Sequence, residues 1–242
     1  MPIFDTRDVL RGFRPEIVPE TGTEMVRWSP RFEGRDGAGV RIALLDGGAS
    51  LADPDLAGAA ITHVDFAGDP PDSPEDTHHA TRDLLLLVGQ GRCLVRGLVP
   101  AAEIFHARVL TAEGGDTGAL AAAITWAQDK GAHIVVMPIG MEAADPTVAA
   151  AIDRALAAGI CLFAAAGNGF PRSLDFPAAH PGVLAVGAAD DRGALLPSCC
   201  RTPRLDRIAP GSGPPALALP GSGSSFACVL AGGAWALRSQ AT

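Results

Sequence analysis

The apolar residues of this chain fall into short uncharged runs that alternate with stretches of helical spacing. Residues 40–46 (VRIALLD) end in an acid followed by two glycines, and a short apolar run of this kind is typical of a buried strand. Ile124 and Ala127 lie four and seven positions after Leu120, and Gly131 follows, as at the end of a helix. The predicted strands are residues 40–46, 104–109, 133–137, 160–166 and 183–188, and the predicted helices are residues 81–87, 117–130, 146–158 and 225–238. Residues 95–99 lead into a turn at Pro100.

This alternation predicts the α/β class, with a mostly parallel sheet flanked by helices and joined by right-handed crossovers. Neither a repeat nor a linker interrupts the pattern, so we interpret residues 37–242 as one domain. The first 36 residues are polar, with Pro15, Pro19 and Pro30 and little periodicity. We expect an extended N-terminal lead-in there, with a short helix near residues 5–13.

Composition narrows the possible functions. The net charge is −8, with one lysine against 18 arginines and no basic tract, which argues against a nucleic-acid partner. No run approaches the roughly 20 uncharged apolar residues of a membrane span. The five cysteines are an odd number without CxxC spacing, so they fit neither a disulfide framework nor a zinc site. With no visible secretion signal, this predicts a cytoplasmic protein with mostly buried thiols.

The acidic segment 69–76 (DPPDSPED) is the one stretch that could suggest calcium. Its prolines and irregular spacing favour a solvated loop instead. We therefore predict no bound metal and no cofactor.

Four polar residues stand where an open parallel sheet binds ligands, beyond the carboxyl ends of its strands or at the starts of helices. Asp46 ends the first predicted strand, Asn168 follows the strand at 160–166, and His79 and Ser225 open helices. A hydroxyl, an imidazole, a carboxylate and a carboxamide suffice for acyl transfer. The order Asp, His, Ser along the chain is that of the subtilisin triad.

Each assignment has a simpler alternative. His78 competes with His79, and Ser222 and Ser224 compete with Ser225 from what we interpret as a flexible Gly/Ser stretch. Asn168, between two glycines, has the composition of a turn. Asp46 and Ser225 could merely cap a turn and a helix. Cys228, three residues after Ser225, is interpreted as a core residue.

From about residue 37 to residue 237 the chain resembles the subtilisin-like serine peptidases. The similar segments are GVRIALLDGG (39–48), DPDL (53–56), HAT (79–81), GLVPAAE (97–103), ARVL (107–110), AAAGN (164–168), FPA (176–178) with VLAVGA (183–188), IAPG (208–211) and GSSFA (223–227). The resemblance implies the three-layer subtilisin-like fold and peptide cleavage by Asp46, His79 and Ser225 with Asn168 as oxyanion donor. It also implies substrate binding at Gly140, Met141, Gly115 and Ala166.

Within that family, the GSSFA form and the absence of a propeptide-sized segment before residue 37 resemble the proteases that mature cyanobactin-type precursor peptides. The expected partner is therefore a peptide or precursor peptide.

Some family motifs are altered. HGTHVAG reads HATRDLL at 79–85, and the proline after the nucleophile is Val229. SLGG reads PIGM at 138–141, where Met141 should narrow the first specificity pocket or alter the approach of the peptide. These changes motivate the alternative function, a catalytically weak or inactive relative that binds a peptide or protein partner without cutting it.

Overall fold

A sheet of eight strands forms the centre of the protein in this computed structural model, which describes residues 3–16, 22–68, 77–202, 204–213 and 222–240. The strand order is β2-β12-β11-β10-β9-β3-β6-β4, and every neighbouring pair is parallel. The sheet strands are β2 (Glu24–Met25), β3 (Arg41–Asp46), β4 (Ala60–Asp65), β6 (Glu103–Arg108), β9 (Ile134–Met137), β10 (Cys161–Ala165), β11 (Leu184–Ala189) and β12 (Arg207–Pro210). The predicted mostly parallel sheet is confirmed.

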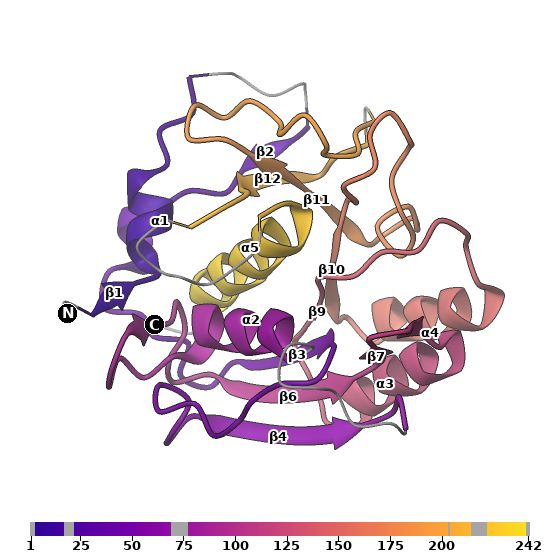
Figure 1. The fold of residues 1–242 in the computed structure, drawn as a ribbon, viewed down its shortest axis with the longest axis horizontal. Helices are drawn as coiled ribbons and strands as arrows, with labels where there is room; N and C mark the ends of the chain where they lie inside the picture. The colour runs from indigo at the N-terminus through magenta and orange to yellow at the C-terminus, as the bar shows by residue number, and fades with distance from the viewer. Residues whose placement is uncertain (1–2, 17–21, 69–76, 203, 214–221, 241–242) are drawn as a thin grey trace.

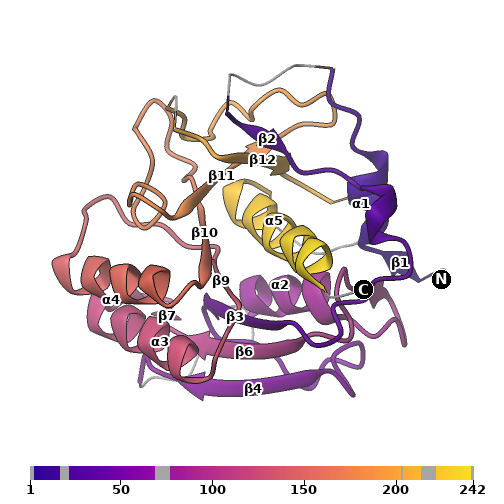
Figure 2. The same cartoon turned by 180° about the vertical axis from the view of Figure 1, so that it is seen from behind.

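Helices cover both faces of this sheet (Figures 1 and 2). Helices α2 (His78–Val88) and α5 (Ser224–Ser239) pack on one face, and α3 (Thr117–Asp129) and α4 (Pro146–Ala157) pack on the other. Successive residues of a strand point to opposite faces, so Ile42 and Leu44 join the core under α2 and α5, whereas Ala43 and Leu45 join the core under α3 and α4. Burial on both faces explains why these strands have uninterrupted apolar sequences.

Local signals set the ends of the helices. Asp116 accepts a hydrogen bond from the Ala119 amide at the start of α3, and Asp145 accepts two at the start of α4. Such caps satisfy amides that have no partner inside the helix. Gly131 and Gly159, just after these helices, have φ of 69° and 81°, a backbone conformation that glycine adopts without strain.

The remaining elements are smaller. They are β1 (Phe4–Asp5), α1 (Arg7–Gly12), the 3₁₀ turn Pro30–Phe32, β5 (Val95–Arg96), and the hairpin of β7 (Leu110–Thr111) with β8 (Gly114–Gly115). Every predicted strand and helix is present within a few residues of its predicted ends, and residues 95–99 contain β5. The sequence did not indicate β4, β12, β2 or the hairpin.

The N-terminal segment is attached to the rest of the chain by backbone pairing. β1 pairs with β5, and β2 adds an edge strand next to β12. The guanidinium of Arg35 donates to the Leu237 carbonyl at 2.7 Å, and the side chain of Gln240 accepts from the amide of Gly37 at 2.8 Å. The short helix predicted near residues 5–13 is present as α1, and two further pieces of the predicted extended lead-in form the paired strands β1 and β2.

Two predictions from composition can be compared with the structure. No helix in the described part of the chain is long and apolar enough to cross a membrane. All five cysteines are free thiols, of which Cys199, Cys200 and Cys228 are buried, Cys161 is half-buried and Cys93 is exposed. Residues 69–76, interpreted as a solvated loop, lie outside the described residues.

Candidate active site

Two of the predicted site residues meet at the end of strand β3. Asp46 is the last residue of β3, and its side chain is 1% exposed. His79 lies in the first turn of α2, with Nδ1 at 2.9 Å and 3.0 Å from the two carboxylate oxygens of Asp46. His78 is exposed. The geometry thus favours His79 over His78 as the imidazole of the site.

The Asp46 carboxylate determines which nitrogen of His79 carries a proton. Burial raises the pKa of Asp46, but the charge and hydrogen bond of His79, with the amide of Gly47 at 2.7 Å, outweigh burial and lower that pKa overall. An ionised carboxylate only accepts hydrogen bonds, so Nδ1–H of His79 donates to Asp46 and Nε2 is left as the basic atom.

The same carboxylate makes His79 more basic than a free imidazole. Burial lowers the pKa of His79, but the charge and hydrogen bond of Asp46, together with the charge of Asp83, raise it to about 9. The neutral form of the imidazole, which is the form that accepts a proton, therefore predominates only in alkaline solution.

Asp83, which sequence reasoning did not single out, is a second carboxylate beside this pair. It lies one helical turn after His79, is fully buried, and has its Oδ2 3.7 Å from Nδ1 of His79. Its Oδ1 accepts a 2.6 Å hydrogen bond from Nε of Arg82, which is also buried. Burial raises the pKa of Asp83 to about 7, although the charges of Arg82 and His79 partly oppose this.

The cluster of Asp46, His79 and Asp83 has the residue types of a metal site, because one ligand atom from each lies within 4.8 Å of the others. A cation there would have to displace the Nδ1 proton that Asp46 already accepts. It would also face the buried guanidinium of Arg82, and like charges repel strongly where water is excluded. We assign no metal to this cluster.

Asn168 is held at the other side of the site by the start of α5. Its Oδ1 accepts hydrogen bonds from the amide of Ser224 at 3.0 Å and from the hydroxyl of Ser224 at 3.2 Å. Because the oxygen end is fixed, Nδ2 is the end left to donate elsewhere. Gly223 makes this approach possible: its φ is 120°, and a Cβ there would lie 2.6 Å from Oδ1 of Asn168.

The sequence suggested that Ser224 belongs to a flexible Gly/Ser stretch, but in the structure it is held by hydrogen bonds. It is fully buried in the first turn of α5, and its hydroxyl also accepts a 3.1 Å hydrogen bond from the amide of Gly167. Its contacts hold Asn168, which leaves Ser225 as the half-buried hydroxyl at the start of the helix.

Ser225 lies in the first turn of α5, and this turn contacts α2. Arg82, one turn after His79, has its guanidinium 5.7 Å from the ring centre of Phe226, the residue after Ser225. No hydrogen bond joins His79 to Ser225 among the described residues, and catalytic hydrogen bonds are often long until substrate is bound. The structure thus pairs Asp46 with His79 and places α2 in contact with the helix that carries Ser225, while the role of Ser225 stays a prediction.

The predicted substrate-binding residues lie in two neighbouring segments and one hairpin. Met141 pairs through its backbone with Phe176, with hydrogen bonds of 2.7 Å and 2.8 Å, and its side chain packs against the core under α3 and α4. Gly140 is exposed, Ala166 is fully buried, and Gly115 is exposed in β8. Restriction of the cleft by Met141 stays a prediction.

Asp175 is a further carboxylate between these segments. Its amide donates to the Ala166 carbonyl at 3.0 Å, a Cβ on Gly140 would lie 2.9 Å from its Cβ, and a Cβ on Gly167 would clash with its carboxylate. Its side chain is 13% exposed, and the nearest described cation is Arg172 at 3.8 Å. Burial raises the pKa of Asp175, and Arg172 only partly offsets this.

Comparison with known proteins decides the family. A family model described as the subtilase family (Peptidase_S8) matches residues 37–242. The chain belongs to the subtilase family. Among its relatives, the thermostable alkaline protease of Halalkalibacterium halodurans is 33% identical over 72% of this chain and 48% of its own length. Alkaline elastase YaB of a Bacillus species is 32% identical over 74% of this chain and 47% of its own length. This subtilase spans about half the length of these relatives.

Solved structures give the same fold. The S218A mutant of the protease domain of PatA matches with a TM-score of 0.74 and 27% identity, over 84% of this chain and 80% of that chain. The prenylagaramide maturation protease PagA matches with a TM-score of 0.70 and 28% identity, over 82% and 74%. The predicted subtilisin-like family and three-layer fold are confirmed.

Proposed function

We propose that this subtilase is a serine endopeptidase in which Asp46, His79 and Ser225 form the catalytic triad. The observation that carries the proposal is the hydrogen bond from His79 to the buried carboxylate of Asp46, which leaves Nε2 basic in the first turn of α2, a helix that contacts the first turn of the helix bearing Ser225 through Arg82 and Phe226. Membership of the subtilase family and similarity to alkaline proteases support the same activity.

The groups account for each step of peptide cleavage. The Ser225 hydroxyl attacks the substrate carbonyl carbon while Nε2 of His79 takes its proton, and Asp46 stabilises the imidazolium that forms. The carbonyl oxygen becomes an anion, which the Nδ2 of Asn168 stabilises from the position that Ser224 gives it. The imidazolium then protonates the leaving amine as the C–N bond breaks. Water, deprotonated by His79, releases the acyl group and regenerates Ser225.

The proposed substrate is a segment of a precursor peptide. Its support is the likeness to PatA and PagA, of which one structure is named as a patellamide maturation protease and the other as a prenylagaramide maturation protease. We further infer that a basic residue precedes the cleaved bond, because Asp175 lies between the predicted substrate-binding segments without a hydrogen bond to its carboxylate from any described residue. A poorly solvated carboxylate with no donor gains most from a cationic side chain.

A fluorophosphonate probe tests the activity, because it labels only an activated serine. The wild type, Ser222→Ala and Ser224→Ala should be labelled, Ser224→Ala more slowly because Asn168 loses its hydroxyl contact, and Ser225→Ala should not. Intact mass would locate the adduct. Labelling that survives in Ser225→Ala would move the nucleophile elsewhere, and a wild type that stays unlabelled would favour the alternative function of binding without cleavage.

Matched fluorogenic peptides that differ only in the residue before the cleaved bond test the role of Asp175. We expect kcat/KM to be about tenfold or more higher for arginine than for glutamine. Asp175→Asn should remove most of this preference, and Asp129→Asn, an exposed carboxylate on α3, should keep it. An equal preference in wild type and Asp175→Asn would contradict the inference while leaving the triad untouched.

A further inference from the structure

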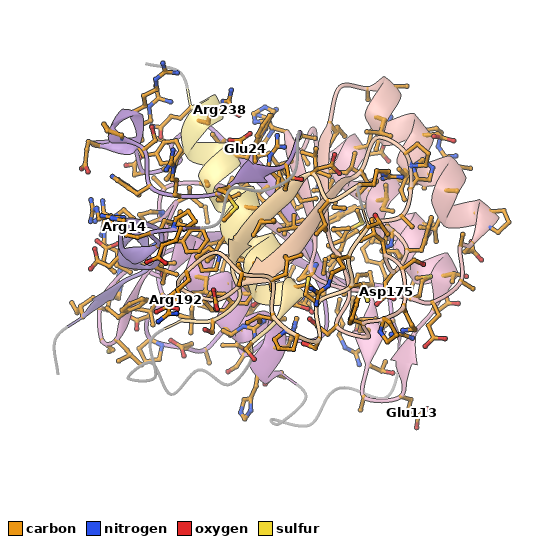
Figure 3. The ribbon with its side chains drawn as sticks, turned by 90° about the horizontal axis from the view of Figure 1, so that it is seen from above. Arg14, Glu24, Glu113, Asp175, Arg192 and Arg238 are labelled. Carbon is orange, nitrogen blue, oxygen red and sulfur yellow. The ribbon has the colours of Figure 1, made fainter. Side chains whose placement is uncertain are left out.

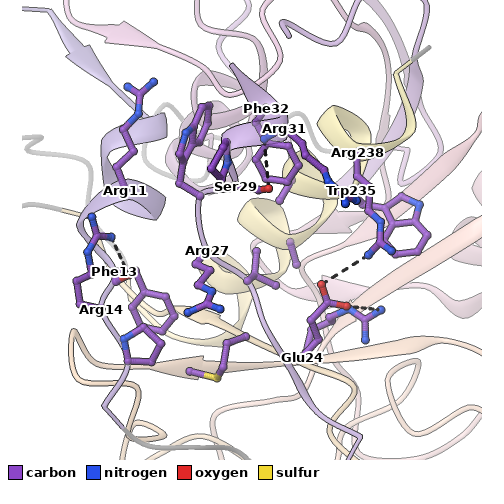
Figure 4. Close-up of a pocket in the computed structure, with 18 of the residues that line it drawn as sticks. Arg11, Phe13, Arg14, Glu24, Arg27, Ser29, Arg31, Phe32, Trp235 and Arg238 are labelled. Atoms are coloured by element: carbon purple, nitrogen blue, oxygen red, sulfur yellow. Dashed lines mark hydrogen bonds and ion pairs between the residues drawn. The ribbon is translucent and has the colours of Figure 1, made fainter. Parts of the chain in front are cut away.

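A large groove lies away from the candidate active site, between the N-terminal segment and the end of α5. Its volume is about 1450 Å³, larger than the roughly 300–1,000 Å³ of small-molecule pockets. Seven arginines line it: five from residues 11–35, Arg207 from β12 and Arg238 from α5. Figure 4 shows Arg11, Arg14 and Arg27 on one side, and Arg238 and Glu24 on the other.

The charge of this groove is opposite to that of the rest of the molecule. Glu16 and Glu24 are the acidic residues among the described residues of the lining, which together carry a formal charge of +5. The whole chain carries −8, which leaves −13 on all other residues. Such segregation creates a local field that attracts anions to the groove.

Part of that positive charge has no internal counter-ion. Glu24 is shared by Arg207 at 3.3 Å and Arg238 at 3.7 Å. The side chains of Arg27 and Arg31 are exposed and have no hydrogen bond or ion pair with any described residue. These two guanidiniums are therefore available to an outside carboxylate, which arginine binds with paired hydrogen bonds.

The aromatic lining suits a polypeptide better than a small ion. The guanidinium of Arg11 lies over Trp28, 4.3 Å from the ring centre, and those of Arg207 and Arg238 lie 5.8 Å and 5.4 Å from the ring centre of Trp235. Indole rings provide apolar contact area next to the charges. The positive charge is confined to the groove, whereas the rest of the chain is acidic. A short acidic peptide segment matches this limited area, but a nucleic acid is charged along its whole length and would also meet the acidic surface.

Helix α5 links this groove to the candidate active site. Ser225 is at its start, and Trp235 and Arg238 are at its end; Figure 3 shows Arg238 and Glu24 side by side at that end, with Asp175 toward the other. Thirteen residues of helix span about 20 Å. A peptide that reached both places would need at least about six extended residues between them.

We propose that the groove binds an acidic segment of the peptide substrate, remote from the cleaved bond. This rests on the proposed function, because the bound segment would hold the rest of the same peptide close to Ser225. Tethering raises the effective concentration of the cleavable segment without any new contact at the active site.

Binding is tested first, without catalysis, in the full-length Ser225→Ala protein. Fluorescence anisotropy with a labelled hexaglutamate peptide should show binding that weakens as salt is added, and a hexaglutamine peptide should not bind. Arg27→Glu/Arg31→Glu should weaken binding by about tenfold or more, and the milder Arg27→Gln/Arg31→Gln by less. Arg92→Glu/Arg154→Glu, two exposed arginines outside the groove, is the matched control and should bind as before.

Cleavage gives the second measurement, in protein with Ser225 intact. A peptide joined to hexaglutamate through a flexible linker of at least six residues should have a lower KM than the same peptide alone, with similar kcat. The ratio of the two KM values should fall to about one in Arg27→Glu/Arg31→Glu and persist in Arg92→Glu/Arg154→Glu.

The proposal would be overturned if Arg27→Glu/Arg31→Glu and Arg92→Glu/Arg154→Glu bound hexaglutamate equally well, or if hexaglutamine bound as tightly as hexaglutamate. It would also be overturned if a single-stranded oligonucleotide bound more tightly than hexaglutamate, or if sedimentation showed a dimer that hexaglutamate dissociates. The last result would assign the groove to a second copy of the chain. Hexaglutamate binding by a protein that fluorophosphonate fails to label would leave the groove in place and refute the proposed function instead.

Discussion

The two ends of helix α5 differ in the sign and the burial of the charged side chains around them. Next to its first turn, where Phe226 contacts Arg82 of α2, the buried carboxylates of Asp46 and Asp83 lie around the imidazole of His79. At its end, arginines are spread over an open groove and several are exposed. The helix dipole suits both arrangements, since it favours anions at the start, where an oxyanion would form, and cations at the end.

The difference between the ends lies in how strongly each charge acts. Buried charges interact with little screening, so a change near His79 alters the chemistry directly. Exposed charges are screened by water and salt, and each contributes little to stability. We therefore expect changes at the start of α5 to have large effects on rate, and changes at its end to affect mainly the capture of charged partners.

The largest effect should come from the imidazole. His79→Ala should lower kcat by about 10⁶-fold, because the nucleophile and its base act as a unit. His78→Ala, the exposed neighbour, should stay within about twofold of the wild type. Steady-state rates on one fluorogenic peptide measure both, and a large loss in His78→Ala with activity retained in His79→Ala would reverse the assignment.

A smaller loss should follow removal of the oxyanion donor. Asn168→Ala should lower kcat by about 10²–10³-fold with little change in KM, because the side chain donates mainly to the charge that develops in the transition state. A change confined to KM would show that Asn168 binds the substrate instead.

The pH profile should then respond to the second buried carboxylate. With the pKa of His79 raised to about 9, kcat/KM should rise with pH and level off above that value, because protonated His79 cannot act as a base. Asp83→Asn removes a negative charge that favours the imidazolium, so the rising limb should move to lower pH. Asp129→Asn is the control and should leave the profile unchanged. If the rising limb of kcat/KM in Asp83→Asn lay at the same pH as in the wild type, Asp83 would not act on His79.

The smallest effect belongs to the far end of the helix. Glu24 is about half exposed and pairs with Arg207 and Arg238, so Glu24→Gln should change the free energy of unfolding by less than about 1 kcal/mol in urea denaturation. It should nevertheless tighten hexaglutamate binding, because two arginines lose their internal partner. Glu113→Gln, at the β7–β8 turn far from the groove (Figure 3), should change neither.

The sequence predicted the elements that are buried on both faces. β3, β9 and β10 are uninterrupted apolar runs, and those runs exist because helices cover both sides. β4 was missed because it is an edge strand whose residues are mostly exposed or half-exposed. β2 and β12 were missed because two and four residues, one of them a proline, carry too little pattern to recognise.

The same distinction holds for the site. Asp46, His79, Asn168 and Ser225 could be named because their motifs are local in sequence. In the sequence, Asp83 has the character of an ordinary polar residue beside a run of leucines. An acid directly before four leucines is nevertheless a signal that could have indicated a buried carboxylate. The groove has no such signal, because its arginines come from residues 11 to 238 and meet only in the folded chain.

The pairing of β2 with β12 has a consequence for how the chain folds. Glu24 pairs with Arg207, so this edge closes a loop that spans most of the sequence, and contacts of such long range slow folding. At a synthesis rate of roughly 5–20 residues per second, residue 24 waits roughly 10–40 s before residue 207 is made. During that interval Val26 and Phe32, buried in the finished protein, have no partner from α5. The N-terminal segment is thus made well before the strand and the helix that complete its packing.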